Sequence, residues 1–424
     1  MCTILRKISR FEFILIYLSL LFFAGYYFFE YWTLPGIVII AGLLMFRIKK
    51  VTHVQRNVGY VFLFMLFNIL ITEIITSLMY SEYAPSLLMI GLSAVNLILA
   101  FIFSQETYYS DFKENFINCM VAIAGVSLIA FVLYQMEPSI IERFPILVNS
   151  NGRVGHFMIF ATLSDFSMAG AQRNQGIFWE PGAFQVFLNL AYIFELSSKN
   201  RKPRKWVIVL FLLSVITSYS TTGIIVAVAL LAFTLSRHKE TTSIIKAMIA
   251  VCIVGMALYY IIPKLTGFWQ YTLVKKIKML FDYQVGVSND SSSRIDSIFY
   301  PLVGFLKSPL LGMGSAGIAR LANEVGHSMF TCSPINWFAY YGTAYGTLVV
   351  IGIWKFFRNI FSNRFEAAVI LLIFLVSVSS EALQGNIIVM TICFLGYTRV
   401  FNHPEDADET IKVSNNIVWS QEKI

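Results

Sequence analysis

Long apolar segments separated by short polar ones dominate the chain. Each apolar segment runs for roughly 15 to 22 residues, which matches the ~20 residues that an α-helix needs to cross a bilayer, and the alternating strand pattern of a membrane barrel is not present. The pattern predicts an all-α polytopic membrane protein with about twelve transmembrane helices. We expect these helices at 11–28, 33–47, 58–79, 84–104, 115–135, 183–197, 206–218, 221–236, 247–263, 331–354, 366–380 and 386–401.

The N-terminal segment predicts the orientation of the first helix. Arg6, Lys7 and Arg10 precede the first apolar segment, and no small-residue cleavage site follows it before the next polar segment. We therefore interpret this segment as a retained anchor and not as a signal peptide, with both chain termini in the cytoplasm.

The distribution of lysine and arginine agrees with this orientation. The segments predicted inside hold 22 of the 32 basic residues. The other ten lie in two long outer loops, at about 136–182 and 264–330, and long loops are exempt from the positive-inside rule. No basic residue lies in the four short turns predicted outside, at 29–32, 80–83, 219–220 and 381–385.

Composition supports a membrane protein and excludes an ordinary soluble one. Hydrophobic residues make up 57% of the chain and charged residues only 13%, and the mean hydropathy is +0.69. We expect one transmembrane catalytic domain, 1–402, and a cytoplasmic tail, 403–424. The apolar stretch His156–Ala171 contains a charged residue, and we interpret it as a re-entrant or interfacial segment of the first outer loop.

Charge and cysteine content limit the partners. The net charge of +8 follows from the inside positions of the basic residues, so it requires no nucleic acid. The five cysteines are scattered, without a CxxC pair, and we expect no metal ion or other cofactor. In the second outer loop, apolar residues recur at helical spacing among lysines over 269–281, which predicts an interfacial helix. Its lysines attract either a lipid-linked phosphate or the anionic headgroups of membrane lipids.

Arg173–Gly182 concentrates chemical groups in the first outer loop. Gly176, Pro181 and Gly182 allow a tight backbone turn immediately before a predicted helix. Trp179 offers a flat face for stacking on a sugar or, alternatively, an anchor at the membrane interface. Arg173 and Glu180 either act on a substrate or pair with each other structurally.

The second outer loop supplies further candidates. Arg294 is suited to a diphosphate, because the planar guanidinium donates two parallel hydrogen bonds. Gly312 and Gly314 shape a turn. His327 precedes a predicted helix on the same side as Arg173 and Glu180; an imidazole there takes a proton from a hydroxyl nucleophile or has a structural role. Within the membrane, Glu73 lines a cavity or forms hydrogen bonds that hold helices together.

In their order along the chain, these residues resemble the Wzy-type O-antigen polymerases and the related O-antigen ligases. The similarity is most specific in Arg173, in Gly176-Ile-Phe-Trp-Glu-Pro-Gly182-Ala-Phe, and in Leu188-Asn-Leu190. It continues in Ser292 and Arg294, in Pro309-Leu-Leu-Gly-Met-Gly314, and in His327-Ser before a helix with Tyr340, Tyr341 and Gly342.

The resemblance covers most of the chain as architecture and implies a GT-C-like, metal-independent, inverting glycosyltransferase. The implied donor and acceptor are oligosaccharides on undecaprenyl pyrophosphate at the periplasmic face of the bacterial inner membrane, with a chain-length regulator as a further partner. Arg173 and Arg294 would bind the diphosphate, and His327, or Glu180 in second place, would be the base. The family has Arg-x10-Gly patterns, whereas eight residues separate Arg173 from Gly182 and nine separate Arg294 from Gly304, so the exact roles of the arginines stay open.

Two other functions fit parts of the pattern. An O-antigen ligase would use the same donor and transfer the glycan to lipid A-core, but the Phe-Trp-Glu-Pro-Gly string is more typical of the polymerases. A polysaccharide flippase or exporter would place charged residues along a passage through several helices, whereas this chain keeps most of them outside the apolar segments.

Overall fold

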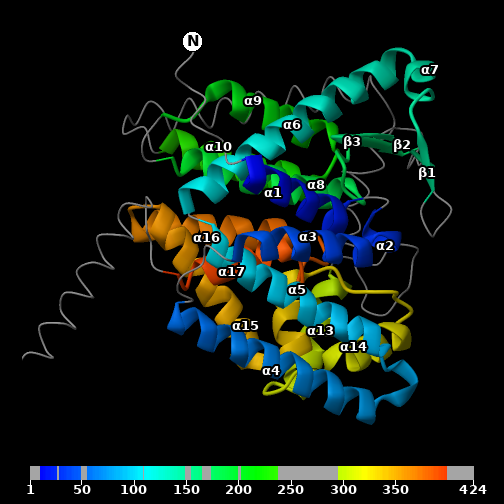
Figure 1. The fold of residues 1–424 in the computed structure, drawn as a ribbon, viewed down its shortest axis with the longest axis vertical. Coiled ribbons are helices and arrows are strands. Elements are labelled where there is room, and N and C mark those ends of the chain that lie inside the picture. Colours follow the sequence, from blue (N-terminus) through cyan, green and yellow to red (C-terminus); the bar gives the residue numbers. More distant parts are fainter. Residues whose placement is uncertain are drawn as a thin grey trace, which may run out of the picture.

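The protein is a bundle of α-helices. The computed structural model describes residues 10–25, 28–48, 55–107, 109–148, 154–164, 173–198, 202–236 and 295–398, and most of these residues are helical, as predicted (Figure 1). Within these described ranges, three helices are long and apolar enough to cross a membrane, and shorter apolar helices accompany them. The chain is therefore a mostly helical, membrane-associated protein.

Eleven of the twelve predicted apolar segments coincide with a helix, and the twelfth, 247–263, lies outside the described residues. The matching helices are α1 (Arg10–Ala24), α3 (Thr33–Ile48), α4 (Arg56–Met79), α5 (Leu87–Glu106), α6 (Tyr109–Met136), α8 (Pro181–Leu196), α9 (Lys205–Thr217), α10 (Thr221–Ser236), α15 (Ser333–Ile360), α16 (Arg364–Val378) and α17 (Ile387–Leu395). The connecting segments add α2 (Phe28–Tyr31), the 3-10 turn η1 (Ser81–Tyr83), α7 (Pro138–Ile141), α13 (Asp296–Lys307) and α14 (Gly314–Glu324).

The prediction of a fold without strands was wrong for one segment. Three short strands form an antiparallel sheet, β1 (Ile146–Val148), β2 (Val154–Met158) and β3 (Ala161–Ser164), in that order. The described part of the predicted re-entrant stretch, 156–164, therefore belongs to a β-hairpin. Strands of three to five residues are too short to show an alternating pattern, and Ala161 and Leu163 pack on Ala130 of α6.

Helix α8 is the central helix of the bundle. All sixteen of its residues are buried, because α6, α9, α10 and α16 pack around it. A helix apolar on every side suits such a position, and its polar residues bond to neighbouring helices. The Gln185 amide donates to the Ser377 carbonyl of α16 at 3.4 Å, and the Asn189 amide donates to the Gly223 carbonyl of α10 at 3.5 Å.

The loops predicted inside contact one another at one end of the bundle. Arg204, from the segment after α8, lies 3.9 Å from Glu114 of α6 and forms a bidentate ion pair with buried Glu195. Before α4, the Gln55 backbone N–H donates to Gln105 Oε1 at 3.4 Å.

The turns predicted outside contact the predicted outer loops. Asn323 donates to the Tyr83 hydroxyl at 3.1 Å, and Phe28, immediately before the turn 29–32, has its ring 5.6 Å from that of Phe157 between centroids. In Figure 1 the helices run across the picture, with the strands, α7 and α2 at their right-hand ends. The turns at 219–220 and 381–385 contact the first outer loop in the same way, as described below.

Helix α15 is interrupted at Gly342. The backbone there has φ +77° and ψ −177°, and a Cβ at this position would lie 2.0 Å from the Leu310 carbonyl oxygen. The loop 309–314 fills the break: Thr343 N–H donates to the Pro309 carbonyl at 2.8 Å, and Met313 N–H donates to the Ala339 carbonyl at 2.8 Å. Two segments of the resemblance, 309–314 and 340–342, are thus in direct contact. A break buried in protein in this way keeps its backbone groups hydrogen-bonded.

Glu73 of α4 has the hydrogen-bonded role that was one of its two predicted roles. Its carboxylate accepts from the Ser315 backbone N–H at 3.2 Å, from the Ser315 hydroxyl at 2.7 Å and from the Tyr341 hydroxyl at 3.1 Å. Because Ser315 is in the first turn of α14, the carboxylate satisfies that helix N-terminus. Glu73 joins α4, α14 and α15.

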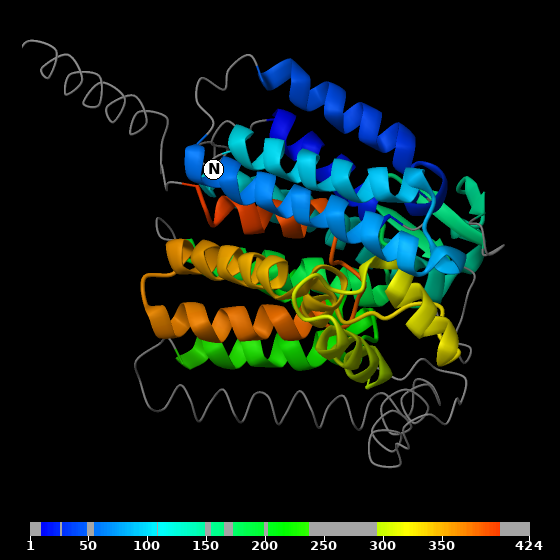
Figure 2. The same ribbon diagram turned by 90° about the horizontal axis from the view of Figure 1, so that it is seen from below.

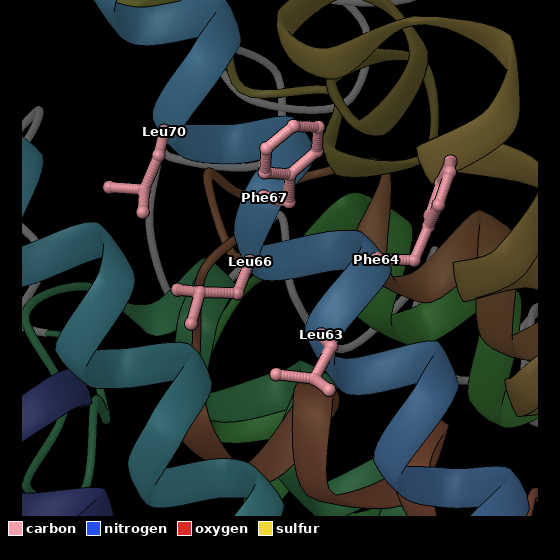
Figure 3. A pocket seen from close by; sticks show the side chains of 5 residues that line it. All are labelled: Leu63, Phe64, Leu66, Phe67 and Leu70. Atoms are coloured by element: carbon pink, nitrogen blue, oxygen red, sulfur yellow. The ribbon is translucent and has the colours of Figure 1, made fainter.

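One face of α4 is apolar and exposed. It carries a shallow depression of about 470 Å³, and all the side chains that line it come from α4 (Figure 3). Figure 1 shows α4 at the lower edge of the bundle, and Figure 2, seen from below, has this helix in the foreground. An apolar helix face of this kind suits contact with lipid tails. The lining residues are Leu63, Phe64, Leu66, Phe67 and Leu70.

Candidate functional site

Arg173 holds the turn between α9 and α10. Its Nε donates to the Ser218 carbonyl at 3.0 Å and its Nη2 donates to the Tyr219 carbonyl at 3.2 Å. Tyr219 in this turn has φ +51°, a value that residues other than glycine rarely adopt. Burial of the Tyr219 side chain raises the pKa of its hydroxyl. The two bonds fix the guanidinium, half-buried, at the end of α9 predicted to lie outside.

Local hydrogen bonds shape the segment that follows Arg173. The Asn174 carbonyl oxygen Oδ1 accepts from Gly176 N–H at 3.1 Å, and the Asn174 amide donates to Thr217 Oγ1 at 3.1 Å. Gly176 has φ +58°, and a Cβ there would lie 2.9 Å from the Phe184 ring. The glycine is thus required both by the turn conformation and by close packing.

The segment then enters α8 through Glu180 and Pro181. Glu180 is the N-cap residue, with an extended backbone at φ −155° and ψ 160°, and Pro181 occupies the first helical position. Trp179 N–H donates to the Ala24 carbonyl at 3.0 Å, which ties this entry to the end of α1. The Trp179 side chain is half-buried against the core, and its stacking on a sugar stays a prediction.

Gly182 has a different reason to be glycine than the turn that the sequence suggested. It is the second residue of α8, and a Cβ there would lie only 1.8 Å from Glu381 Oε1. The Glu381 side chain, 1% exposed, therefore occupies the space that a larger residue at 182 would need. Sequence reasoning missed Glu381 because it is part of a short turn between two apolar segments. The sequence signal that could have identified Glu381 is the presence of a carboxylate in such a turn.

The turn 379–386, between α16 and α17, connects three helix ends. Ser333, the first residue of α15, donates its hydroxyl to the Glu381 carbonyl and accepts from Leu383 N–H at 2.6 Å. Trp337 Nε1–H donates to the Gln384 carbonyl at 3.2 Å. Asn386 caps α17 and also donates to the Phe23 carbonyl of α1 at 3.3 Å. The starts of α8 and α15 and the end of α1 all meet this turn.

His327 is positioned by the C-terminal cap of α14. Gly326 has φ +74° and donates to the Asn323 carbonyl at 3.1 Å, while His327 N–H donates to the Ala322 carbonyl at 2.8 Å. These two bonds define a Schellman motif, which fixes the direction in which the chain leaves the helix.

The His327 ring pairs with a carboxylate that sequence reasoning missed. Its Nε2 lies 3.3 Å from Asp296 Oδ2, in the first turn of α13, and both side chains are nearly buried, at 11% and 13% exposure. The rings of Tyr300 and Phe330 lie beside it, with centroids 6.4 and 6.0 Å away. When Nε2–H donates to Asp296, the lone pair is on Nδ1. An oriented imidazole of this kind is the usual arrangement for a general base.

The described contacts bring most of the predicted residues into two groups. The first group comprises Arg173, Gly176 and Trp179–Gly182, which belong to the segment that leads into α8, and Glu381, which meets the first turn of this helix. His327 and Asp296 form the second group, and the Asn336 amide in the first turn of α15 donates to the Phe330 carbonyl beside it at 2.8 Å. The first turn of α15 therefore contacts both groups.

Other predicted residues have separate positions. Gly312 and Gly314, with φ +83° and +57°, shape the loop that enters the break in α15. Arg294, the lysine-rich segment 269–281 and the tail 403–424 lie outside the described residues. Over the described ranges, no group of three His, Cys, Asp or Glu side chains is arranged to hold a metal ion.

No protein-family model matches this chain, and the search of curated proteins found no match.

Proposed function

We propose that this protein is an O-antigen polymerase, a multi-pass glycosyltransferase of the bacterial inner membrane with about twelve transmembrane helices. It moves the growing glycan from undecaprenyl pyrophosphate to the next lipid-linked repeat unit at the periplasmic face. The observation that carries the proposal is the segment that leads into α8. Arg173 in this segment is fixed on the α9–α10 turn, and the carboxylates of Glu180 and Glu381 lie at the start of a helix that is buried at every residue.

The leaving group explains the need for arginine. As the glycosidic bond breaks, negative charge develops on the diphosphate and has to be neutralised. The Arg173 guanidinium carries five N–H donors, and the bonds to the α9–α10 turn hold it in one place, so little reorganisation is needed when an anion arrives. Arg294, from the second outer loop, is the other proposed phosphate ligand.

The acceptor hydroxyl needs a base. His327 is the first choice, because Asp296 orients its ring and stabilises the imidazolium that forms when Nδ1 takes the proton. Glu180 is the second choice. In an inverting transfer the hydroxyl oxygen bonds to the anomeric carbon as the bond to the diphosphate breaks, and the hydroxyl proton moves to the base. The diphosphate leaves with the bonding electron pair.

The contacts made by the turns and loops predicted outside and inside support a single active face. Three of the turns predicted outside, and Phe28 beside the fourth, contact the predicted outer loops, whereas Arg204 and Gln55 contact the segment 105–114 that is predicted inside. Reporter fusions after residues 160 and 300 should be periplasmic and a fusion after residue 203 cytoplasmic. A cytoplasmic signal at residue 300 would contradict this topology.

Deletion of the gene tests the function directly through the ladder of surface lipopolysaccharide. A polymerase deletion should leave core with one repeat unit. Bare core would instead indicate a ligase or a flippase, and an unchanged ladder would rule out all three functions.

Point variants test the roles within the site. Arg173→Ala and Arg294→Ala should each abolish long chains at normal protein level, and lysine should rescue poorly because it lacks the bidentate guanidinium. His327→Ala should lose on the order of 10²- to 10⁴-fold in rate, with Glu180→Gln the milder change. If His327→Ala polymerises normally and Glu180→Gln is inactive, the base is Glu180. Activity of the purified protein should persist in the presence of a chelator.

A further inference from the structure

Glu381 is a buried carboxylate outside the predicted site. It lies in the turn 379–386 and is 1% exposed. Removing a carboxylate from water costs several kcal/mol unless the surroundings compensate its charge, so such a residue needs a structural or functional reason.

The surroundings of Glu381 are specific. Ser333 bonds to the backbone on both sides of the turn, at the Glu381 carbonyl and at Leu383 N–H, and so sets the position of the Glu381 backbone. The side chain then reaches the first turn of α8, where Gly182 leaves room for Oε1. The partial positive charge of a helix N-terminus favours an anion at that point.

The position of Glu381 determines that of the predicted site. Gly182 is two residues after Glu180, and the same short segment leads back to Arg173 through Trp179, which is bonded to α1. A shift of the first turn of α8 would therefore move the Glu180 side chain. Displacements of about 1 Å in a catalytic group cost on the order of 10²-fold in rate.

We propose that Glu381 is a positioning residue of the glycosyl transfer site, which holds the first turn of α8, and with it Glu180 and Arg173, in the geometry that the reaction requires. The role rests on the proposed function. It assigns to the α16–α17 turn a part in activity, although this turn belongs to neither outer loop.

The contact between Gly182 and Glu381 supplies a test by steric rescue, and thermal unfolding of the same variants separates an effect on activity from a loss of stability. Gly182→Ala places a methyl group where Oε1 now lies, and it should lower activity on the order of 10²-fold. Glu381→Asp withdraws the carboxylate by one methylene, about 1.5 Å, which opens the space again. The double variant should therefore recover at least about tenfold of the activity lost in Gly182→Ala.

The charge is tested with Glu381→Gln, which keeps the size of the side chain. We expect kcat to fall roughly 10- to 100-fold, with KM for the lipid-linked repeat unit changed by less than about threefold, because positioning acts on the transition state. Glu12→Gln is the matched control: Glu12 is also 1% exposed and accepts from the Asn115 amide at 2.9 Å, but it lies at the end of α1 predicted inside. This variant should keep wild-type kinetics.

All variants are assayed as full-length protein in detergent with a synthetic undecaprenyl-diphosphate repeat unit, and thermal unfolding is measured in parallel. Wild-type kcat in Glu381→Gln, or a double variant no more active than Gly182→Ala, would overturn the positioning role alone. A wild-type protein that forms no polymer would overturn the proposed function, and the positioning role with it.

Discussion

The hydrogen bonds of Glu73 allow a quantitative test of how the bundle is held together. Glu73→Ala removes the acceptor for three donors: the Ser315 N–H, the Ser315 hydroxyl and the Tyr341 hydroxyl. A buried donor without a partner costs about 1–3 kcal/mol. Ser315 is half-buried, so water reaches it in part, and we expect the lower end of the combined range, about 3 kcal/mol.

The measurement is thermal unfolding in detergent. With an unfolding entropy of about 2.1 cal/mol/K per residue, a loss of 3 kcal/mol in a chain of this length lowers Tm by about 3 °C. Tyr341→Phe removes one bond and should cost about 1 kcal/mol. In the Glu73→Ala/Tyr341→Phe double variant, the loss of unfolding free energy should be about 0.5–1.5 kcal/mol smaller than the sum of the two single losses, because both substitutions remove the same Tyr341–Glu73 bond.

The control lies one residue further along α4. Ile74 is 55% exposed, so Ile74→Ala should change the unfolding free energy by no more than about 0.5 kcal/mol. If Glu73→Ala and Ile74→Ala have the same Tm, or if the double-variant costs simply add, the Glu73 network does not hold α4, α14 and α15 together.

Three further outcomes follow from the structure. At Gly342, with φ +77°, an added Cβ would lie 2.0 Å from the Leu310 carbonyl oxygen, so Gly342→Ala should prevent accumulation of folded protein in size-exclusion chromatography. The control, Gly125→Ala, has open space in α6 and should be neutral or stabilising by up to about 1 kcal/mol. Normal folding of Gly342→Ala would contradict the break in α15. Arg204→Ala removes the guanidinium from buried Glu195, which still accepts from the backbone N–H of residue 204, and should cost about 1.5–3 kcal/mol in thermal unfolding, the usual range for hydrogen bonds to a charged group. Arg204→Lys should lose less, and equal losses would argue against the bidentate pair. Gly326→Ala should lower the free energy of unfolding by only about 1–2 kcal/mol, because the added Cβ meets open space. It should reduce polymerisation far more, because it changes the direction in which the chain leaves α14 and so moves His327. Activity that falls only in proportion to the amount of folded protein would refute this.

The sequence by itself determined the helices. The apolar segment 221–236 predicted α10 at the residues that this helix occupies. Most ends of the other matching helices were predicted to within a few residues. These features depend on local chemistry: an apolar stretch long enough to span a bilayer satisfies its backbone as a helix, and Pro181 favours the start of one. The same local chemistry indicated the turn before α8.

Only the tertiary structure decided which side chains meet. His327 and Asp296 are 31 positions apart, and Glu73 and Tyr341 are 268 apart, so no periodicity relates them. Gly182 was interpreted as a turn residue because its contact with Glu381 depends on how α16 and α17 pack against α8. The break at Gly342 was equally hidden within an apolar segment, since the loop 309–314 that fills it comes from another part of the chain. Hydrophobic pattern sets where helices form, because that depends on neighbours in the chain, but close approach and hydrogen bonding between helices depend on shape complementarity, which the pattern does not specify.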